Sequence, residues 1–174
     1  MGLGPLVAIF LRLILPLTIF RWPLGGAILS IIVDTVDVVI VGIINQGDFP
    51  DYAAIDKMLD MYYLTFLLLV SLKWKDLLAR KTSIFLFAYR FCGFLLFEVT
   101  KIRLFLFLFP NLFLDFYLFF AVWKKITKKP KLTARKLLII LIILLIPKMA
   151  QEYMLHFLEF KPWHWFHTEI LKVP

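Results

Sequence analysis

Long apolar stretches follow one another along almost the whole chain, separated only by short polar or basic segments. Of the 174 residues, 62% are hydrophobic and 18% are charged, so polar side chains are too few to cover a water-soluble globule of this size. A bilayer needs no such cover, and one helical crossing takes about 20 apolar residues. We therefore expect an all-α, polytopic membrane helical bundle in the cell membrane, with about six transmembrane helices in a single domain over residues 1–174.

The polar breaks predict where these helices lie. The first apolar segment lacks the charged start and small-residue cleavage site of a signal peptide, so we expect it to be retained. The stretch from 83 to 123 is too long for one crossing, and Phe109-Pro110-Asn111 predicts a turn within it. The expected helices cover about 3–20, 24–45, 55–72, 83–103 and 106–123, and a sixth begins at 137.

The polar character of the sixth helix changes after Pro147. Lys148, Glu152 and His156 recur every four residues, which places them on one face of a helix. The aromatic stretch 162–167 is typical of a segment at the membrane interface. Cys92 is the single cysteine, and we expect it to be a small buried hydrophobe.

Four aspartates are the strongest site markers in the sequence, because ionisable groups within apolar spans are costly unless they face a partner, a cavity or an ion. Asp34 and Asp37 are three residues apart, and Asp56 and Asp60 are four apart, so each pair projects from one helix face. A short connection makes the two helices antiparallel neighbours, which allows both pairs to converge. Such carboxylates would repel one another unless divalent cations lay between them, and oxygen ligands suit Mg²⁺, Mn²⁺ or Ca²⁺.

Two other interpretations of the aspartates stay open. Some of them, Asp56 above all, can cap or line helix ends near water. Alternatively, intramembrane carboxylates can form a pathway for cations or protons in a transporter or channel.

The next apolar stretch adds a second group of charged residues. Arg90 and Glu98 are two helical turns apart and can both point to the bundle interior. Lys101 and Arg103 are expected near the mouth of the same pocket, where they and Arg90 can bind a substrate phosphate, with Glu98 and Asp115 in supporting positions. The alternative is an interhelical ion pair between these residues, together with a snorkelling lysine.

The pattern Asp34-Thr35-Val36-Asp37 followed by Asp56-Lys57-Met58-Leu59-Asp60 resembles the CDP-alcohol phosphatidyltransferase family, and the segment 9–16 is similar to the first helix of that family. The resemblance covers about the first 75 residues. It implies a transferase of phospholipid biosynthesis that moves a phosphatidyl or phosphoalcohol group from a CDP-activated lipid donor to an acceptor alcohol. It further implies that Mg²⁺ or Mn²⁺ is held by Asp34, Asp37 and Asp56, and that Asp60 lies near the second metal and acts as the catalytic base.

The sequence departs from the family pattern at the small residues. Val38 and Tyr52 stand where the family has glycine, Val41-Gly42 stands where it has Ala-Arg, and the gap between the two aspartate pairs is one residue longer. The small residues of the family let the nucleotide approach the helix, so the departures bear on nucleotide binding more than on metal binding. A divergent relative with a non-nucleotide donor, or with no catalysis, is the alternative.

Basic residues are concentrated in two segments, and the formal net charge is +8. The two clusters are Lys73, Lys75, Arg80 and Lys81, and Lys124, Lys125, Lys128, Lys129, Lys131, Arg135 and Lys136. We interpret them as anchors facing anionic membrane lipids rather than as a nucleic-acid site.

The distribution of basic residues also bears on orientation. With six crossings, one side of the membrane holds 12 Lys and Arg residues and the other holds five, which favours the basic side as cytoplasmic. The aspartates then lie toward the opposite side, whereas the resemblance implies a cytoplasmic pocket. Orientation and oligomeric state therefore stay open, with a homodimer among the alternatives.

Overall fold

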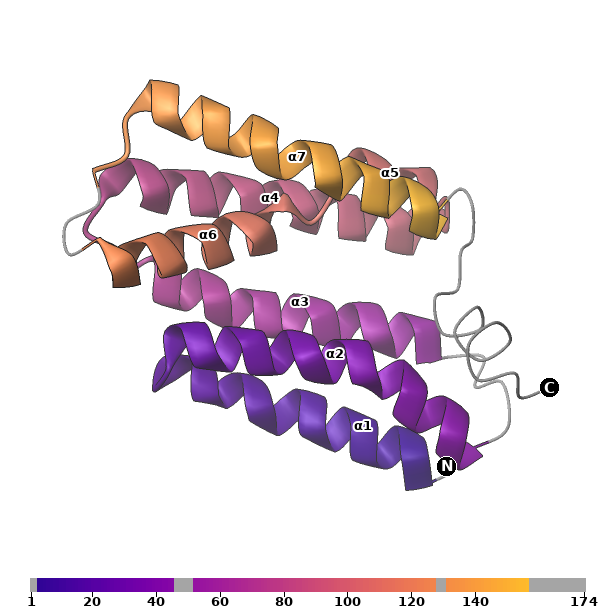
Figure 1. Cartoon of the computed structure of the whole chain (residues 1–174). Coiled ribbons are helices and arrows are strands. Elements are labelled where there is room, and N and C mark those ends of the chain that lie inside the picture. The colour runs from indigo at the N-terminus through magenta and orange to yellow at the C-terminus, as the bar shows by residue number, and fades with distance from the viewer. Residues whose placement is uncertain (1–2, 46–51, 128–130, 157–174) are drawn as a thin grey trace, which may run out of the picture.

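The structure, a computed structural model, describes residues 3–45, 52–127 and 131–156, and every regular element within these ranges is a helix. The elements are α1 (Leu3–Ile14), the 3₁₀ helix η1 (Leu15–Phe20), α2 (Pro23–Asn45), α3 (Tyr52–Ser71), α4 (Leu77–Thr100), α5 (Leu104–Leu108), α6 (Leu112–Ile126) and α7 (Ala134–His156). In Figure 1 the helices lie side by side along one direction, with α1, α2 and α3 in the lower part and α4 to α7 in the upper part. The expected all-α bundle is confirmed.

Three helical segments in the described part of the chain are long and apolar enough to cross a membrane: 77–100, 104–126, which joins α5 and α6, and 134–154. Their outer faces carry large apolar side chains in the open, such as Phe85 and Ile146, which are 66% and 67% exposed. Such faces suit contact with lipid rather than water. The chain is therefore a helical membrane protein, while the expected number of about six crossings and the identity of the membrane stay predictions.

The first expected helix is divided by proline. The α-helical geometry of α1 ends at Ile14, and η1 continues with Pro16 near its start, because a proline has no N–H to donate to the preceding turn. The chain then reverses into α2, whose Gly26 lies against the backbone of Ile19. A Cβ atom on Gly26 would lie 2.5 Å from the Ile19 nitrogen, so only glycine permits this close approach.

Two predicted boundaries in the middle of the chain are wrong. The helix expected from 83 starts at Leu77, because the Asp76 carboxylate accepts a hydrogen bond from the Ala79 N–H at 2.9 Å and caps α4. The main reversal occurs at Lys101, whose left-handed φ of 57° ends α4. The predicted turn at 109–111 is present, but it separates α5 from α6 and interrupts the helix expected over 106–123.

The core between α3, α4 and α6 is dominated by aromatic side chains. One face of α6 is fully or almost fully buried, with Phe113, Phe116, Tyr117 and Phe120 at helical spacing. Trp74, which follows α3, lies with its ring centroid 4.4 Å from that of Phe120. This aromatic core fixes how α3 and α6 approach each other.

Two expectations on the later helices have different outcomes. The prediction that Cys92 is buried is wrong, because the side chain lies on the exposed outer surface of α4. The polar stripe on α7 is present: the helix continues through Pro147, and Lys148 Nζ lies 3.5 Å from Glu152 Oε1. The side chain of His156 and the expected interfacial segment 162–167 lie outside what the structure describes.

Candidate functional site

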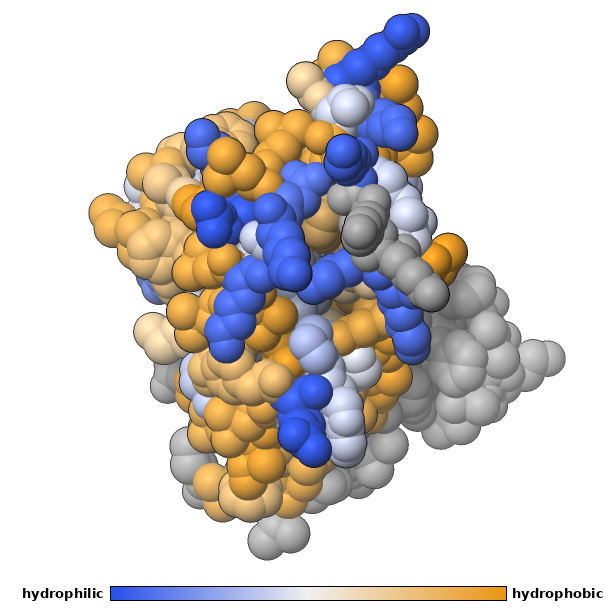
Figure 2. Space-filling model, turned by 90° about the vertical axis from the view of Figure 1, so that its left-hand side faces the viewer, coloured by the Kyte–Doolittle hydropathy of each residue, from blue (hydrophilic) through white to orange (hydrophobic). Residues whose placement is uncertain are grey.

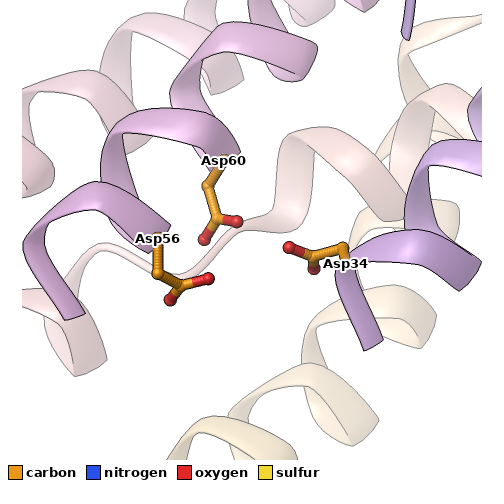
Figure 3. A group of neighbouring side chains, drawn as sticks. All are labelled: Asp34, Asp56 and Asp60. Atoms are coloured by element: carbon orange, nitrogen blue, oxygen red, sulfur yellow. The ribbon is translucent and has the colours of Figure 1, made fainter. Parts of the chain in front are cut away.

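The first three helices bring five charged side chains to one point in the lower half of the bundle. Arg12 comes from α1, Asp34 and Asp37 from α2, and Asp56 and Asp60 from α3. Figure 3 shows Asp34 reaching from its helix toward Asp56 and Asp60 on the neighbouring one. The convergence that the spacing of the aspartates predicted is therefore present.

Arg12 lies at the centre of this cluster and forms an ion pair with every aspartate in it. Its Nη1 donates to Asp37 Oδ2 and to Asp56 Oδ1, both at 2.5 Å. Its Nη2 donates to Asp60 Oδ1 at 2.5 Å and also to Asp34 Oδ1. The guanidinium thus joins α1 to both aspartate helices through charge-assisted hydrogen bonds.

The cluster has a closed and an accessible side. Arg12 is 3% exposed and Asp37 is 0% exposed, whereas the side chains of Asp34, Asp56 and Asp60 are 28%, 22% and 20% exposed. Asp37 therefore lies on the closed side, and the other three carboxylates line the side that a ligand can reach.

A second cation, Lys57, lies at the edge of the cluster. Its Nζ is 2.7 Å from Asp56 Oδ2 and 3.9 Å from Asp60 Oδ2. Arg12 and Lys57 together neutralise half of the charge on the four carboxylates, so the ionised cluster keeps an excess of two negative charges. In a partly buried site, where charges are screened less than in bulk water, this excess favours binding of a further cation.

The donor atoms of the accessible side fit a hard divalent cation. One carboxylate oxygen from each of Asp34, Asp56 and Asp60 lies within 4.8 Å of the other two. Two oxygens on opposite sides of one ion are separated by roughly 4 Å for Mg²⁺ and roughly 5 Å for Ca²⁺, so small side-chain movements bring this group to either geometry. Asp37, expected as a ligand, is not part of this group of three.

Arg90 and Glu98 of α4 have different partners. Arg90 is 7% exposed and donates to the Phe109 carbonyl at 2.9 Å and to the Leu106 carbonyl at 3.4 Å. It thereby ties α4 to the α5–α6 junction, and it lies close enough to Lys57 to act on it electrostatically. Glu98 instead pairs with Lys101 on the same side of its own helix.

The remaining predicted residues lie on α4, α5 and α6. The side chain of Lys101 is 64% exposed at the C-cap of α4, and Arg103 is exposed at the N-cap of α5. Asp115 lies on α6 within electrostatic range of Lys148 and Glu152 of α7, and its Oδ2 has no hydrogen-bond partner among the described residues. None of these three contributes to the group of carboxylate oxygens described above.

The central position of Arg12 is the feature that the sequence reasoning missed. The signal was available, because an arginine within an apolar span needs an acidic partner, and Asp34 and Asp37 of the next helix are the nearest acids along the chain.

No protein family, curated protein or solved structure matches the chain. The case for a function therefore depends on the residues of the cluster and their geometry.

Proposed function

We propose that the protein is a divalent-metal-dependent transferase, similar to the CDP-alcohol phosphatidyltransferases, that moves a phosphatidyl or phosphoalcohol group to an acceptor alcohol in phospholipid biosynthesis. One observation carries the proposal: two aspartate pairs from separate helices converge, with oxygens of Asp34, Asp56 and Asp60 within 4.8 Å of one another. Oxygen-only donors beside apolar, lipid-facing helices suit chemistry on a charged lipid headgroup.

Asp34 and Asp56, with Asp60 beside them, would hold Mg²⁺ or Mn²⁺. The bound ion would neutralise the donor phosphates and stabilise the leaving phosphate. Asp60 accepts the proton of the acceptor hydroxyl while the hydroxyl oxygen bonds to phosphorus and the bond from phosphorus to the leaving phosphate breaks. Arg12 keeps the carboxylates in place from the closed side, since it binds all of them.

Binding of the substrate phosphate is proposed for one basic residue at the cluster and three on α4 and the α4–α5 connection. Lys57 lies at the accessible edge and is already oriented by Asp56. Arg90 lies within electrostatic range of Lys57. Lys101 and Arg103 are exposed at the α4–α5 connection, where a lipid phosphate can reach them. Because Val38 and Tyr52 replace glycines of the family pattern, the donor need not be a nucleotide.

The test is a transfer assay on the purified protein in phosphatidylcholine vesicles, with Mn²⁺, radiolabelled CDP-diacylglycerol and a panel of acceptor alcohols. A parallel series uses a lipid diphosphate donor without a nucleotide. We expect labelled product only when the divalent ion is present, and more than a hundredfold loss in Asp60→Asn, because the base is removed. Asp115→Asn, which removes an acid outside the cluster, is the matched control and should keep most of the activity.

One observation favours a second candidate function, a membrane protein without catalysis whose aspartates serve only structure. Arg12 already pairs with all four carboxylates, and such a hub can hold three helices together by itself. Titration with Mn²⁺, followed by electron paramagnetic resonance, separates the two. A transferase binds Mn²⁺ and loses it in Asp34→Asn, whereas a structural hub binds none.

A further inference from the structure

A second candidate site lies at the opposite end of α3 from Asp56 and Asp60. It is a cavity of about 410 Å³ between the η1–α2 junction, the end of α3 and the last turns of α6. Figure 2 views the molecule from this end, where hydrophilic side chains gather among apolar ones. Asp60 and Val70 are separated by ten residues of α3, or about 15 Å of helix, so this cavity is distinct from the aspartate cluster.

The inner wall of the cavity is held in place by two buried aromatic residues. Trp74 and Tyr117 are 5% and 0% exposed, and their rings stack with centroids 5.4 Å apart. The Tyr117 hydroxyl also donates to the Pro23 carbonyl at 3.5 Å, which connects α6 to the start of α2. Contacts from α2, α6 and the end of α3 hold this wall in place, so the pocket is preformed, as most ligand sites are.

The sides of the cavity are apolar and its rim is basic. Phe20, Leu24 and Val70 supply the apolar side chains. The rim carries three exposed lysines: Lys73 from the turn after α3, and Lys124 and Lys125 from the last turn of α6.

These rim lysines form no ion pair within the part of the chain that the structure describes. Asp76, the acid in the same loop as Lys73, is occupied instead: its carboxylate accepts from the N–H groups of Ala79 and Leu132, both at 2.9 Å. Three unpaired ammonium groups beside one apolar cavity form a site complementary to an anion that carries a hydrocarbon chain.

We propose that this cavity binds one anionic phospholipid, with its phosphate between Lys73, Lys124 and Lys125 and part of an acyl chain against the apolar sides. Lysine binds phosphate as a point charge, and basic groups at a membrane surface attract anionic lipids. The position supports the same occupant, because the cavity opens at the ends of the apolar helices, where headgroups lie. The proposal does not depend on the transferase activity.

The test measures lipid binding to the detergent-solubilised full chain by native mass spectrometry, with dioleoylphosphatidylglycerol as the probe. The first variant is Lys73→Gln/Lys124→Gln/Lys125→Gln. We expect its affinity for the probe to fall by more than tenfold, since three favourable charge interactions are lost.

The matched control removes the same number of positive charges, from other lysines at the same end of the bundle. Lys75→Gln/Lys81→Gln/Lys136→Gln replaces three exposed lysines that do not line the cavity, and it should keep the affinity within about twofold. Equal losses of lipid affinity in the two triple variants would show that only the overall surface charge matters, and would overturn the proposal.

A second variant tests the apolar part without touching the charges. Ala121→Phe fills the cavity beside the rim, and it should weaken binding of the lipid while leaving any weak binding of inorganic phosphate unchanged. Two results would overturn the proposal: competition by inorganic phosphate at the concentration of the lipid, which would mark a site for free phosphate, or equal affinity for dioleoylphosphatidylcholine.

Discussion

Arg12 is the one residue of the aspartate cluster that forms an ion pair with all four aspartates. Its planar fork presents five N–H donors at fixed angles, so it reaches carboxylates on two helices at once, whereas lysine has one point of charge. The ion pair with the fully buried Asp37, at 2.5 Å, closes the side of the cluster that faces the interior, and the pair with Asp56, also at 2.5 Å, reaches the accessible side. An arginine in this position therefore decides how three helices meet.

Replacing Arg12 with glutamine should destabilise the protein by about 3–5 kcal/mol, because the fully buried Asp37 loses its counter-charge and three partly buried carboxylates lose theirs in part. Millimolar Mn²⁺ should recover part of that loss if an ion enters between the same carboxylates. Thermal unfolding in detergent, with and without Mn²⁺, measures both effects. Arg135→Gln, at an exposed position, should change stability by less than about 0.5 kcal/mol. An Arg12→Gln protein as stable as the unmodified chain would contradict this reading of the cluster.

At the scale of single residues, the sequence predicts which side chains share a helix face more readily than it predicts their hydrogen-bond or ion-pair partners. The spacing of Asp34 and Asp37 fixed one helix face, and that prediction is confirmed by their common contact with Arg12. The partner of Arg90 was not predictable, because the Phe109 carbonyl becomes available only where the chain breaks between α5 and α6. The exposure of Cys92 was missed because a lipid-facing surface is as apolar as a core.

At the scale of elements, helix starts depend on caps that hydropathy does not reveal. The α4 helix includes Arg80 and Lys81, which marked the segment as a loop, yet both are good helix formers once Asp76 caps the first turn. The long apolar segments themselves follow directly from periodicity and length, which is why the bundle was predictable and its boundaries were not.

The two adjacent glycines of α2 test how closely η1 packs on this helix. Gly26→Ala should destabilise by about 1–3 kcal/mol, because its Cβ would lie 2.5 Å from the backbone nitrogen of Ile19, which cannot move without shifting η1. Gly25→Ala is the matched control, since the nearest atom to its Cβ is 3.6 Å away, on Trp22. It should stabilise by up to about 1 kcal/mol through helix propensity. Equal thermal shifts in both variants would show that the close approach is absent.

Asp76 connects two elements as well as capping one. Asp76→Ala should cost about 1–2 kcal/mol for the lost cap on α4, and it also releases Leu132, which precedes α7. Asp76→Asn keeps an acceptor oxygen for the cap and should lose less. Unfolding by denaturant compares the stability of the two variants. A smaller loss of stability for Asp76→Ala than for Asp76→Asn would contradict the role of the Asp76 oxygens as acceptors for both Ala79 and Leu132.

At the scale of the whole molecule, the two ends of the bundle differ in charge. The described residues of the two basic clusters lie at one end, around the N-terminus of α4 and the C-terminus of α6, while the aspartates lie on α2 and on the N-terminal half of α3. Charge asymmetry favours the basic end as cytoplasmic, and the lipid site proposed there agrees with an anionic leaflet. The transferase proposal, by resemblance, favours the opposite orientation, with the aspartates on the cytoplasmic side. A measurement of orientation therefore bears on both proposals.

Cysteine labelling across one candidate span decides the orientation. In a Cys92→Ser background, Ile102→Cys and Thr127→Cys place exposed thiols on either side of the apolar segment 104–126. With the basic end in the cytoplasm, a membrane-impermeant maleimide should label Ile102→Cys in intact cells and Thr127→Cys only after permeabilisation. The reverse pattern would place the aspartates on the cytoplasmic side, as the transferase resemblance requires. Labelling of both thiols in intact cells would instead show that this segment does not cross the membrane.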